Sequence, residues 1–128
     1  MSSETHTRIR EEVLRDTRYP LHRIADKLLP YLRVLLNQFN PEKVVVFGSF
    51  AYGTPDENSD VDLLIIKPIQ QSRIKDKVAI RSAWWPLLLA NAPISFDLML
   101  ADPAESMRLA REKNSFHAEI IQKGLRVI

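Results

Sequence analysis

The sequence predicts an α/β fold, a small sheet with helices packed on it. Three short runs, 44–47, 63–66 and 94–100, are rich in β-branched, aromatic and other apolar residues, as buried strands are. Over 21–39, apolar residues instead recur at helical spacing, and 72–82 also reads as a helix. Segments of both kinds therefore share one chain of 128 residues, a length typical of a single domain.

Two helices are predicted before the first strand. The first covers 7–16, and the second covers 21–39, where Pro30 is expected to kink the helix or to mark a new start. We therefore divide the chain into an amino-terminal helical arm, 1–20, and a domain, 21–128. The arm is available to dock a partner.

After the second strand, a helix is predicted from Ser72 to about Ser82, and Pro86 is expected to disturb its continuation. The two tryptophans beside it, Trp84 and Trp85, are expected in the core rather than as a base-stacking platform. This helix carries a basic stripe that could face a triphosphate or an acidic partner, although a solvated helix face is the simpler interpretation. The stripe consists of Arg73, Lys77 and Arg81.

The carboxyl-terminal part continues as helix. Asp102 followed by Pro103 has the form of a helix start, so Asp102 is expected to be a cap and not a metal ligand. Gly124 is placed to end the last helix, and 125–128 can add a short edge strand.

The most informative stretch lies between the first two strands. Gly48-Ser49 follows the first strand directly, and Asp60-Val61-Asp62 leads into the second. The residues between, 54–59, are dense in turn formers and predict a loop. If the two strands are antiparallel neighbours, the Gly-Ser pair and the acidic pair lie together.

Asp60 and Asp62 are two residues apart, so on a strand they point to the same face, about 6 to 7 Å apart. Leu64 and Ile66 continue that face, so the carboxylates border the core. Ionised carboxylates there are costly without a counter-charge. Mg²⁺ supplies that charge and prefers oxygen ligands, including phosphate oxygens.

Gly48 and Ser49 suit phosphate binding. Glycine lets the backbone approach a ligand closely, and Ser49 adds a hydroxyl beside the first N–H groups of a short helix. The alternative is an ordinary strand-to-helix turn with Asp60 as an ordinary cap. The combination of both motifs at this spacing favours the functional interpretation.

Asp97 is a third candidate. It stands in the middle of the strand-like run 94–100, on the alternate face with Ser95 and Met99. A lone Asp inside a strand is disfavoured by propensity and burial, so it needs a partner. That partner is a bound cation, or alternatively Asp97 pairs with an arginine or caps a loop.

These residues resemble the nucleotidyltransferase superfamily that includes DNA polymerase beta, and most closely its minimal nucleotidyltransferase branch. The matching text is GSFAYGTPDENSDVDLLI, residues 48–65, and the resemblance covers about 21–128. It implies the small mixed sheet with packed helices of that family. One departure is Tyr52, where many relatives have Arg, so an arginine contact to phosphate is in doubt.

The resemblance also implies the roles of the site residues. Gly48 and Ser49 would hold a triphosphate, ATP as donor. Asp60 and Asp62 would ligate two Mg²⁺ ions, for which Mn²⁺ can substitute, and Asp97 would complete the catalytic metal site. The catalytic and metal-binding residues are thus Asp60, Asp62 and Asp97.

Minimal nucleotidyltransferases often resemble the antitoxin of a toxin–antitoxin pair whose partner is a helical HEPN ribonuclease. The resemblance thus implies transfer of AMP to a tyrosine of such a toxin, and a short single domain suits a protein acceptor. Two alternatives stay open: a small-molecule nucleotidyltransferase, and a non-catalytic antitoxin that inhibits by covering its partner. The intact acidic residues argue against the second.

Composition narrows the choice further. The sequence has no cysteine and its three histidines lie far apart, which argues against disulfides and zinc chemistry. The net charge of +2 is too small to indicate nucleic-acid binding. The first six residues lack a signal-peptide core, and no apolar stretch has membrane-spanning length. A cytoplasmic protein is expected, and oligomers stay possible.

Overall fold

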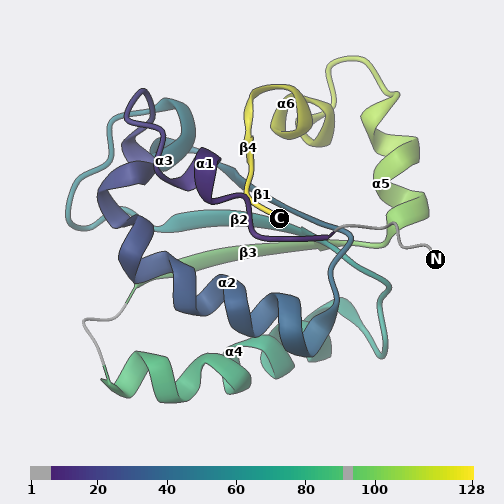
Figure 1. The fold of residues 1–128 in the computed structure, drawn as a ribbon. Helices are drawn as coiled ribbons and strands as arrows, with labels where there is room; N and C mark the ends of the chain where they lie inside the picture. The colour runs from purple at the N-terminus through teal and green to yellow at the C-terminus, as the bar shows by residue number, and fades with distance from the viewer. Residues whose placement is uncertain (1–6, 91–93) are drawn as a thin grey trace.

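The computed structural model describes residues 7–90 and 94–128. At its centre is a four-stranded mixed sheet in the order β3-β2-β1-β4 (Figure 1). Its strands are β1 (Lys43–Phe47), β2 (Val61–Ile66), β3 (Phe96–Ala101) and β4 (Leu125–Arg126). Together with the helices packed on it, this sheet confirms the predicted α/β fold.

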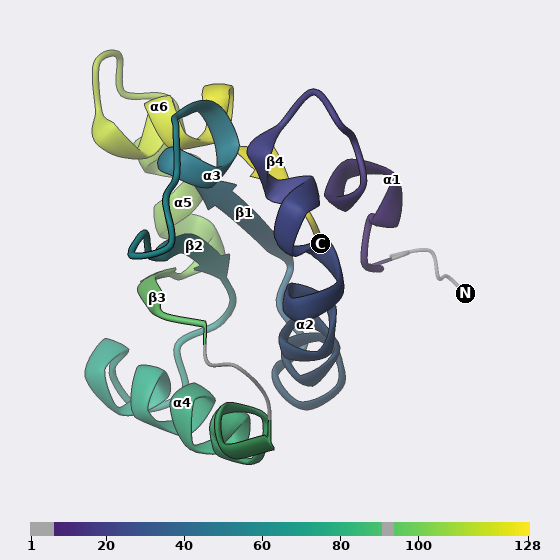
Figure 2. The same cartoon turned by 90° about the vertical axis from the view of Figure 1, so that its left-hand side faces the viewer.

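Helices cover both faces of the sheet. They are α1 (Glu11–Leu14), the 3₁₀ helix η1 (Pro20–Ile24), α2 (Ala25–Phe39), α3 (Ser49–Tyr52), α4 (Arg73–Ala90), α5 (Pro103–Ala110) and α6 (Phe116–Lys123). Figures 1 and 2 show α2 and α4 side by side on one face, and α5 and α6 on the opposite side. None of the helices within the described residues is long and apolar enough to cross a membrane.

The strand pairing brings three segments to one end of the sheet. β1 runs antiparallel to β2, with Phe47 opposite Asp62, so the condition for bringing the Gly-Ser pair and the acidic pair together is met. β2 runs parallel to β3, with Asp62 opposite Asp97. The carboxyl end of β1 therefore meets the amino ends of β2 and β3.

Alternating residues of the strands enter two apolar clusters, one on each face. Toward α2 and α4, strand residues such as Val46, Leu63 and Leu98 pack with Leu28 and Trp84. The smaller cluster on the other face contains strand residues together with Ile120 of α6: Val45, Phe47, Leu64, Ile66, Ala101 and Ile120. Asp62 and Asp97 alternate with residues of the larger cluster, so they lie on the face of the smaller one.

The amino-terminal arm is less helical than predicted. The helix expected over 7–16 is limited to Glu11–Leu14, and its Leu14 is buried in the main core. The Arg10 N–H donates to the Val127 carbonyl at 2.8 Å, which ties the arm to the carboxyl-terminal chain. The contacts of Arg10 and Leu14 therefore pin part of this segment to the domain.

Two prolines are accommodated within helices. The predicted helix 21–39 begins as η1, and α2 then continues through Pro30. α4 continues through Pro86 to Ala90, beyond the predicted end near Ser82, so Pro86 does not end the helix. The carbonyl that each proline leaves unpaired belongs to an exposed residue, Asp26 or Ser82, where water can bind it.

The two tryptophans of α4 have different environments. Trp84 is buried, and its indole N–H donates to the Tyr31 carbonyl at 3.1 Å, as expected for a core residue. Trp85 is 59% exposed, so the prediction that it lies in the core is wrong. Neighbouring helix positions point about 100° apart, and only one of the two can face the sheet.

The caps expected in the carboxyl-terminal part are present. The Asp102 carboxylate accepts from the Ala104 N–H at 3.1 Å and caps α5. Gly124 follows α6 as its cap, and its N–H donates to the Ile120 carbonyl at 2.7 Å. β4 then pairs antiparallel with β1, which confirms the short edge strand.

A buried ion pair joins the end of β2 to the start of α4. Lys67 Nζ lies 2.9 Å from Asp76 Oδ2, and both side chains are almost fully buried. Burial alone would raise the pKa of Asp76, but hydrogen bonds from the Gln70 N–H, Lys67 and the Gln71 N–H outweigh it and hold that pKa below its usual value. Asp76 is thus committed to holding α4 in place.

Candidate active site

The turn after β1 is shaped by Gly48. Its φ of +73° lies in a region that side-chain-bearing residues rarely adopt. A Cβ at this position would overlap Oδ2 of Asp62. The backbone conformation therefore favours glycine, and any larger residue would also force the Asp62 carboxylate to move.

Ser49 begins α3 directly after this turn. The Ala51 and Tyr52 N–H groups both donate to the Gly48 carbonyl, at 3.0 and 3.1 Å. The N–H groups of Ser49 and Phe50 come before these bonds, and at a helix start such amides have no partner within the helix. Ser49 thus presents a hydroxyl and a backbone N–H beside the glycine turn.

The loop 54–59 holds itself in place before β2. The Asp56 N–H donates to Ser59 Oγ at 2.8 Å, and the Asp56 carboxylate accepts from the Asn58 N–H at 2.8 Å. The Val61 N–H then donates to the Ser95 carbonyl at 2.8 Å. This local bonding fixes Asp60, which is exposed, at the entrance of β2.

Asp62 and Asp97 are direct neighbours across the parallel pair of β2 and β3. Opposite residues of adjacent strands share a face, and adjacent strands lie about 4.8 Å apart. Asp62 is half-buried beneath the glycine turn, whereas Asp97 is exposed. The sheet therefore places a sheltered carboxylate beside an accessible one.

The surroundings of Asp62 disfavour its negative charge. Burial raises the pKa of its carboxyl above the usual value, and the charges of Asp97 and Asp60 raise it further. These two neighbours act on Asp62 together, so the three carboxylates share one electrostatic environment. A cation placed among them would relieve this repulsion.

The structure therefore gathers the predicted residues at one end of the sheet. Gly48 and Asp62 are in direct proximity, Asp97 is the strand neighbour of Asp62, and Ser49 and Asp60 adjoin them in sequence. As the side chains stand, no three acidic or histidine residues within 7–90 and 94–128 already form a metal-binding group. Mg²⁺ usually binds through one or two carboxylates plus substrate phosphates, so this arrangement fits such an ion.

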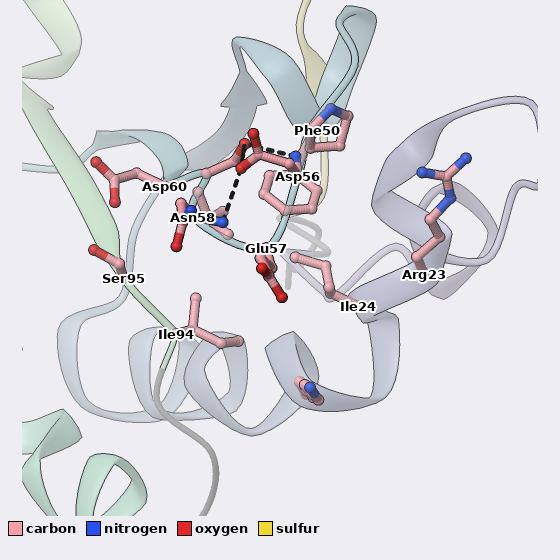
Figure 3. A pocket seen from close by; sticks show the side chains of 13 residues that line it. Arg23, Ile24, Phe50, Asp56, Glu57, Asn58, Asp60, Ile94 and Ser95 are labelled. Atoms are coloured by element: carbon pink, nitrogen blue, oxygen red, sulfur yellow. Dashed lines mark hydrogen bonds between the residues drawn. The ribbon is translucent and has the colours of Figure 1, made fainter.

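A cavity of about 580 Å³ adjoins Asp60 on the side of α2 (Figure 3). In Figure 3, Arg23 lies at one side of it, while Asp60 and Ser95 lie at the other. Of the five predicted site residues, it includes Asp60 alone. The other two carboxylates lie outside the residues that line this cavity, with Asp97 exposed and Asp62 half-buried.

Three further residues around the site escaped prediction from sequence. Arg23 and Lys27 line the cavity, and their only sequence signal is a four-residue helical spacing. Gly53 donates its N–H to the Ser49 carbonyl at 3.0 Å, and a Cβ on it would lie 2.7 Å from Ser49 Cα. The sequence signal that could have indicated Gly53 is a second glycine only five residues after Gly48, at the end of the short helix α3.

In the basic stripe of α4, Arg73 and Arg81 are exposed, as a solvated helix face would be, and each also bonds to a neighbouring element. Arg73 pairs with Glu105 and donates to the Leu100 carbonyl, and Arg81 donates to the Phe96 carbonyl at 3.1 Å.

Tyr52 stands where many relatives have Arg. It ends α3, and 48% of its surface is exposed.

Comparison with known families agrees with this geometry. The family model described as "Nucleotidyltransferase domain" matches residues 26–127, which includes the glycine turn and all three carboxylates. The chain belongs to the nucleotidyltransferase domain family. Its general activity is therefore nucleotidyl transfer, and it is a transferase. No curated protein matches the sequence.

The match gives the arrangement a chemical meaning. The Gly48 turn has no side chain and adjoins the carboxylate of Asp62. That carboxylate lies near two others, so a cation bound there would offset their mutual repulsion. Oxygen-only side chains suit Mg²⁺ or Mn²⁺ rather than metals that prefer nitrogen or sulfur. Asp60, Asp62 and Asp97 are thus the residues that could hold such ions, and Gly48 and Ser49 are those that could approach a phosphate.

Proposed function

We propose that this domain transfers AMP from ATP to a hydroxyl of a partner protein, most simply a tyrosine. The observation that carries the proposal is the pairing of half-buried Asp62 with exposed Asp97 beneath the Gly48 turn. One carboxylate of this pair is sheltered next to the phosphate-binding turn. The other is open to a reacting group that arrives from outside.

In the proposed reaction, the acceptor oxygen forms a bond to the α-phosphorus of ATP. The bond from that phosphorus to the bridging oxygen breaks, and pyrophosphate leaves with the electron pair. Asp97 accepts the hydroxyl proton. When bound, two Mg²⁺ ions would lower the pKa of the hydroxyl and neutralise the charge of the triphosphate and of pyrophosphate.

The remaining residues orient the reactants. Gly48 and Ser49 would hold the triphosphate against the backbone, while Asp60 and Asp62 bind its metal. Asp62 is fixed by its place in β2, between β1 and β3, so its carboxylate is held without a loop rearrangement. Positioning and charge stabilisation would supply most of the rate enhancement.

A protein acceptor is supported by the openness of the site. Asp60 and Asp97 are both exposed, so a side chain on another folded molecule can reach them. The resemblance of residues 48–65 to minimal nucleotidyltransferases points to a HEPN-type toxin as that molecule, with this chain as the antitoxin. AMP on a tyrosine at the toxin's active site would add charge and bulk where RNA binds.

Intact-mass spectrometry tests this proposal. The protein is incubated with the product of its neighbouring gene, ATP and Mg²⁺, and the partner is expected to gain the mass of one or more AMP groups. EDTA, or replacement of all three aspartates by Asn, should prevent the gain, whereas Asp102→Asn should not, because Asp102 caps α5.

The same reactions separate the enzymatic function from simple binding. We expect the ribonuclease activity of the partner to fall only when AMP is added. If the partner gains no nucleotide mass but is inhibited, and the triple variant inhibits equally well, the protein is a binding antitoxin and the proposal fails.

A further inference from the structure

The outer face of α4 carries an apolar stripe that no other described element covers. It consists of Ile74, Val78, Trp85 and Leu89, which are 76%, 58%, 59% and 70% exposed. Figures 1 and 2 both show α4 at the outside of its layer, with no described element beyond it. Apolar groups exposed in such a row are typical of an interaction site.

The stripe has the spacing of a helix–helix contact. Its residues follow one another at intervals of four, seven and four, so they lie along one side of α4 over about 22 Å. The opposite side of the same helix buries Ile80 and Trp84 in the core. α4 is therefore apolar on two sides, and a helix of that kind is normally buried on both.

A hollow of about 390 Å³ interrupts the stripe at its middle. It is lined by Val78, Arg81, Ser82 and Trp85, which stand at positions i, i+3, i+4 and i+7 of the helix. Four residues at these positions form the hole that receives one side chain of a facing helix in knobs-into-holes packing. The shape of this surface thus fits a helix.

The charges beside the stripe indicate what kind of helix fits. The ionisable residues of α4 are four cations and Asp76, which is buried against Lys67. Arg73 already pairs with Glu105, so Lys75, Lys77 and Arg81 are the cations of α4 that no ion pair among the described residues neutralises. Two copies of this face would therefore bring like charges together, which is unfavourable. Carboxylates beside the apolar residues of a partner would instead be complementary.

We propose that the outer face of α4 docks an amphipathic helix of a partner protein whose apolar stripe is flanked by Asp or Glu. One apolar side chain of that helix fills the hollow between Val78 and Trp85, and its acidic neighbours pair with Lys77 and Arg81. Arg81 keeps its bond to the Phe96 carbonyl, because its guanidinium has other N–H groups to offer. The inference goes beyond the proposed function, since it requires neither metal nor nucleotide.

Designed peptides test the proposal on the full chain. One peptide is an amphipathic helix with Leu at the heptad core positions and Glu beside them, and the second has Lys in place of every Glu. Both are used below the concentrations at which they self-associate. We expect saturable binding of the Glu peptide by calorimetry, with a blue shift in the emission of Trp85, and binding of the Lys peptide at least tenfold weaker.

Substitutions on α4 locate the surface. Val78→Glu and Leu89→Glu should each weaken binding of the Glu peptide at least tenfold. Met107→Glu is the matched control, because Met107 is equally exposed but lies on α5, and it should leave binding unchanged. Replacing Lys77 by Glu should weaken binding of the Glu peptide and strengthen binding of the Lys peptide, so that the preference between the two peptides shrinks. Circular dichroism should confirm that each variant is folded.

Several results would overturn the proposal. They are the absence of saturable binding, equal binding of the two peptides, and equal losses in Met107→Glu and Val78→Glu. Sedimentation that shows a dimer of the protein, abolished by Val78→Glu, would assign the face to a second copy. Binding to phosphatidylserine vesicles that Val78→Glu abolishes, without peptide binding, would assign it to a membrane.

Discussion

Asp97→Asn is expected to reduce nucleotidyl transfer by at least a hundredfold while leaving binding of the metal–triphosphate complex within about threefold of the wild type. Asp97 is the exposed carboxylate of the strand pair, whereas Asp62 lies next to the Gly48 turn. Loss of Asp97 should therefore affect the reacting hydroxyl and not the bound triphosphate. Single-turnover transfer and calorimetric binding measure the two effects separately.

Asp102→Asn is the control for this prediction, because Asp102 follows the other end of β3 and caps α5. It should lower neither transfer nor binding. Near-normal turnover in Asp97→Asn would remove Asp97 from the site. A loss of triphosphate binding as large as the loss of transfer would show that Asp97 does not act separately from Asp60 and Asp62.

Gly48→Ala is expected to reduce transfer by a factor of about 100 or more, since misplacement of a catalytic group by about 1 Å has effects of this size. The new Cβ would overlap Asp62 Oδ2 and displace that carboxylate from the turn. The positive φ should lower the free energy of unfolding by about 1–3 kcal/mol, because alanine is strained in this conformation. Thermal unfolding and transfer assays measure the two consequences.

A double variant separates the causes of that stability loss. In Gly48→Ala combined with Asp62→Ala, the overlap is gone but the positive φ remains. The loss of stability in the double variant should therefore be smaller than the sum of the losses in the two single variants. Transfer should not recover, because Asp62 is absent. Wild-type transfer in Gly48→Ala would show that the turn does not have to adjoin the Asp62 carboxylate for activity.

The strands and the turn between the first two were predictable because their signals are local. The run 44–47 became β1, 63–66 became most of β2, and 94–100 overlaps β3, since continuous apolar residues suit strands buried on both faces. The antiparallel pairing of β1 with β2 was not predictable in the same way, because a connection over 48–60 that contains a helix also permits a parallel crossover. The structure shows the antiparallel pair, and it brings Gly48 beside Asp62.

The parallel pairing of β2 with β3 could not be predicted from such signals. It depends on α4 crossing over one face of the sheet and returning the chain to the same end. The direct contact of Asp62 and Asp97 is a consequence of that crossover. The exposure of Trp85 was missed for a related reason, because which side of α4 faces the core is set by tertiary packing.

Calorimetric titration with ATP in the presence of Mg²⁺ tests the central claim that Gly48, Ser49, Asp60 and Asp62 form a metal-dependent triphosphate site. The wild-type protein should bind, and either EDTA or the double replacement of Asp60 and Asp62 by Asn should weaken that binding at least tenfold. Asp102→Asn should bind as the wild type does. Triphosphate affinity unchanged by EDTA and by the double replacement would contradict the proposed site.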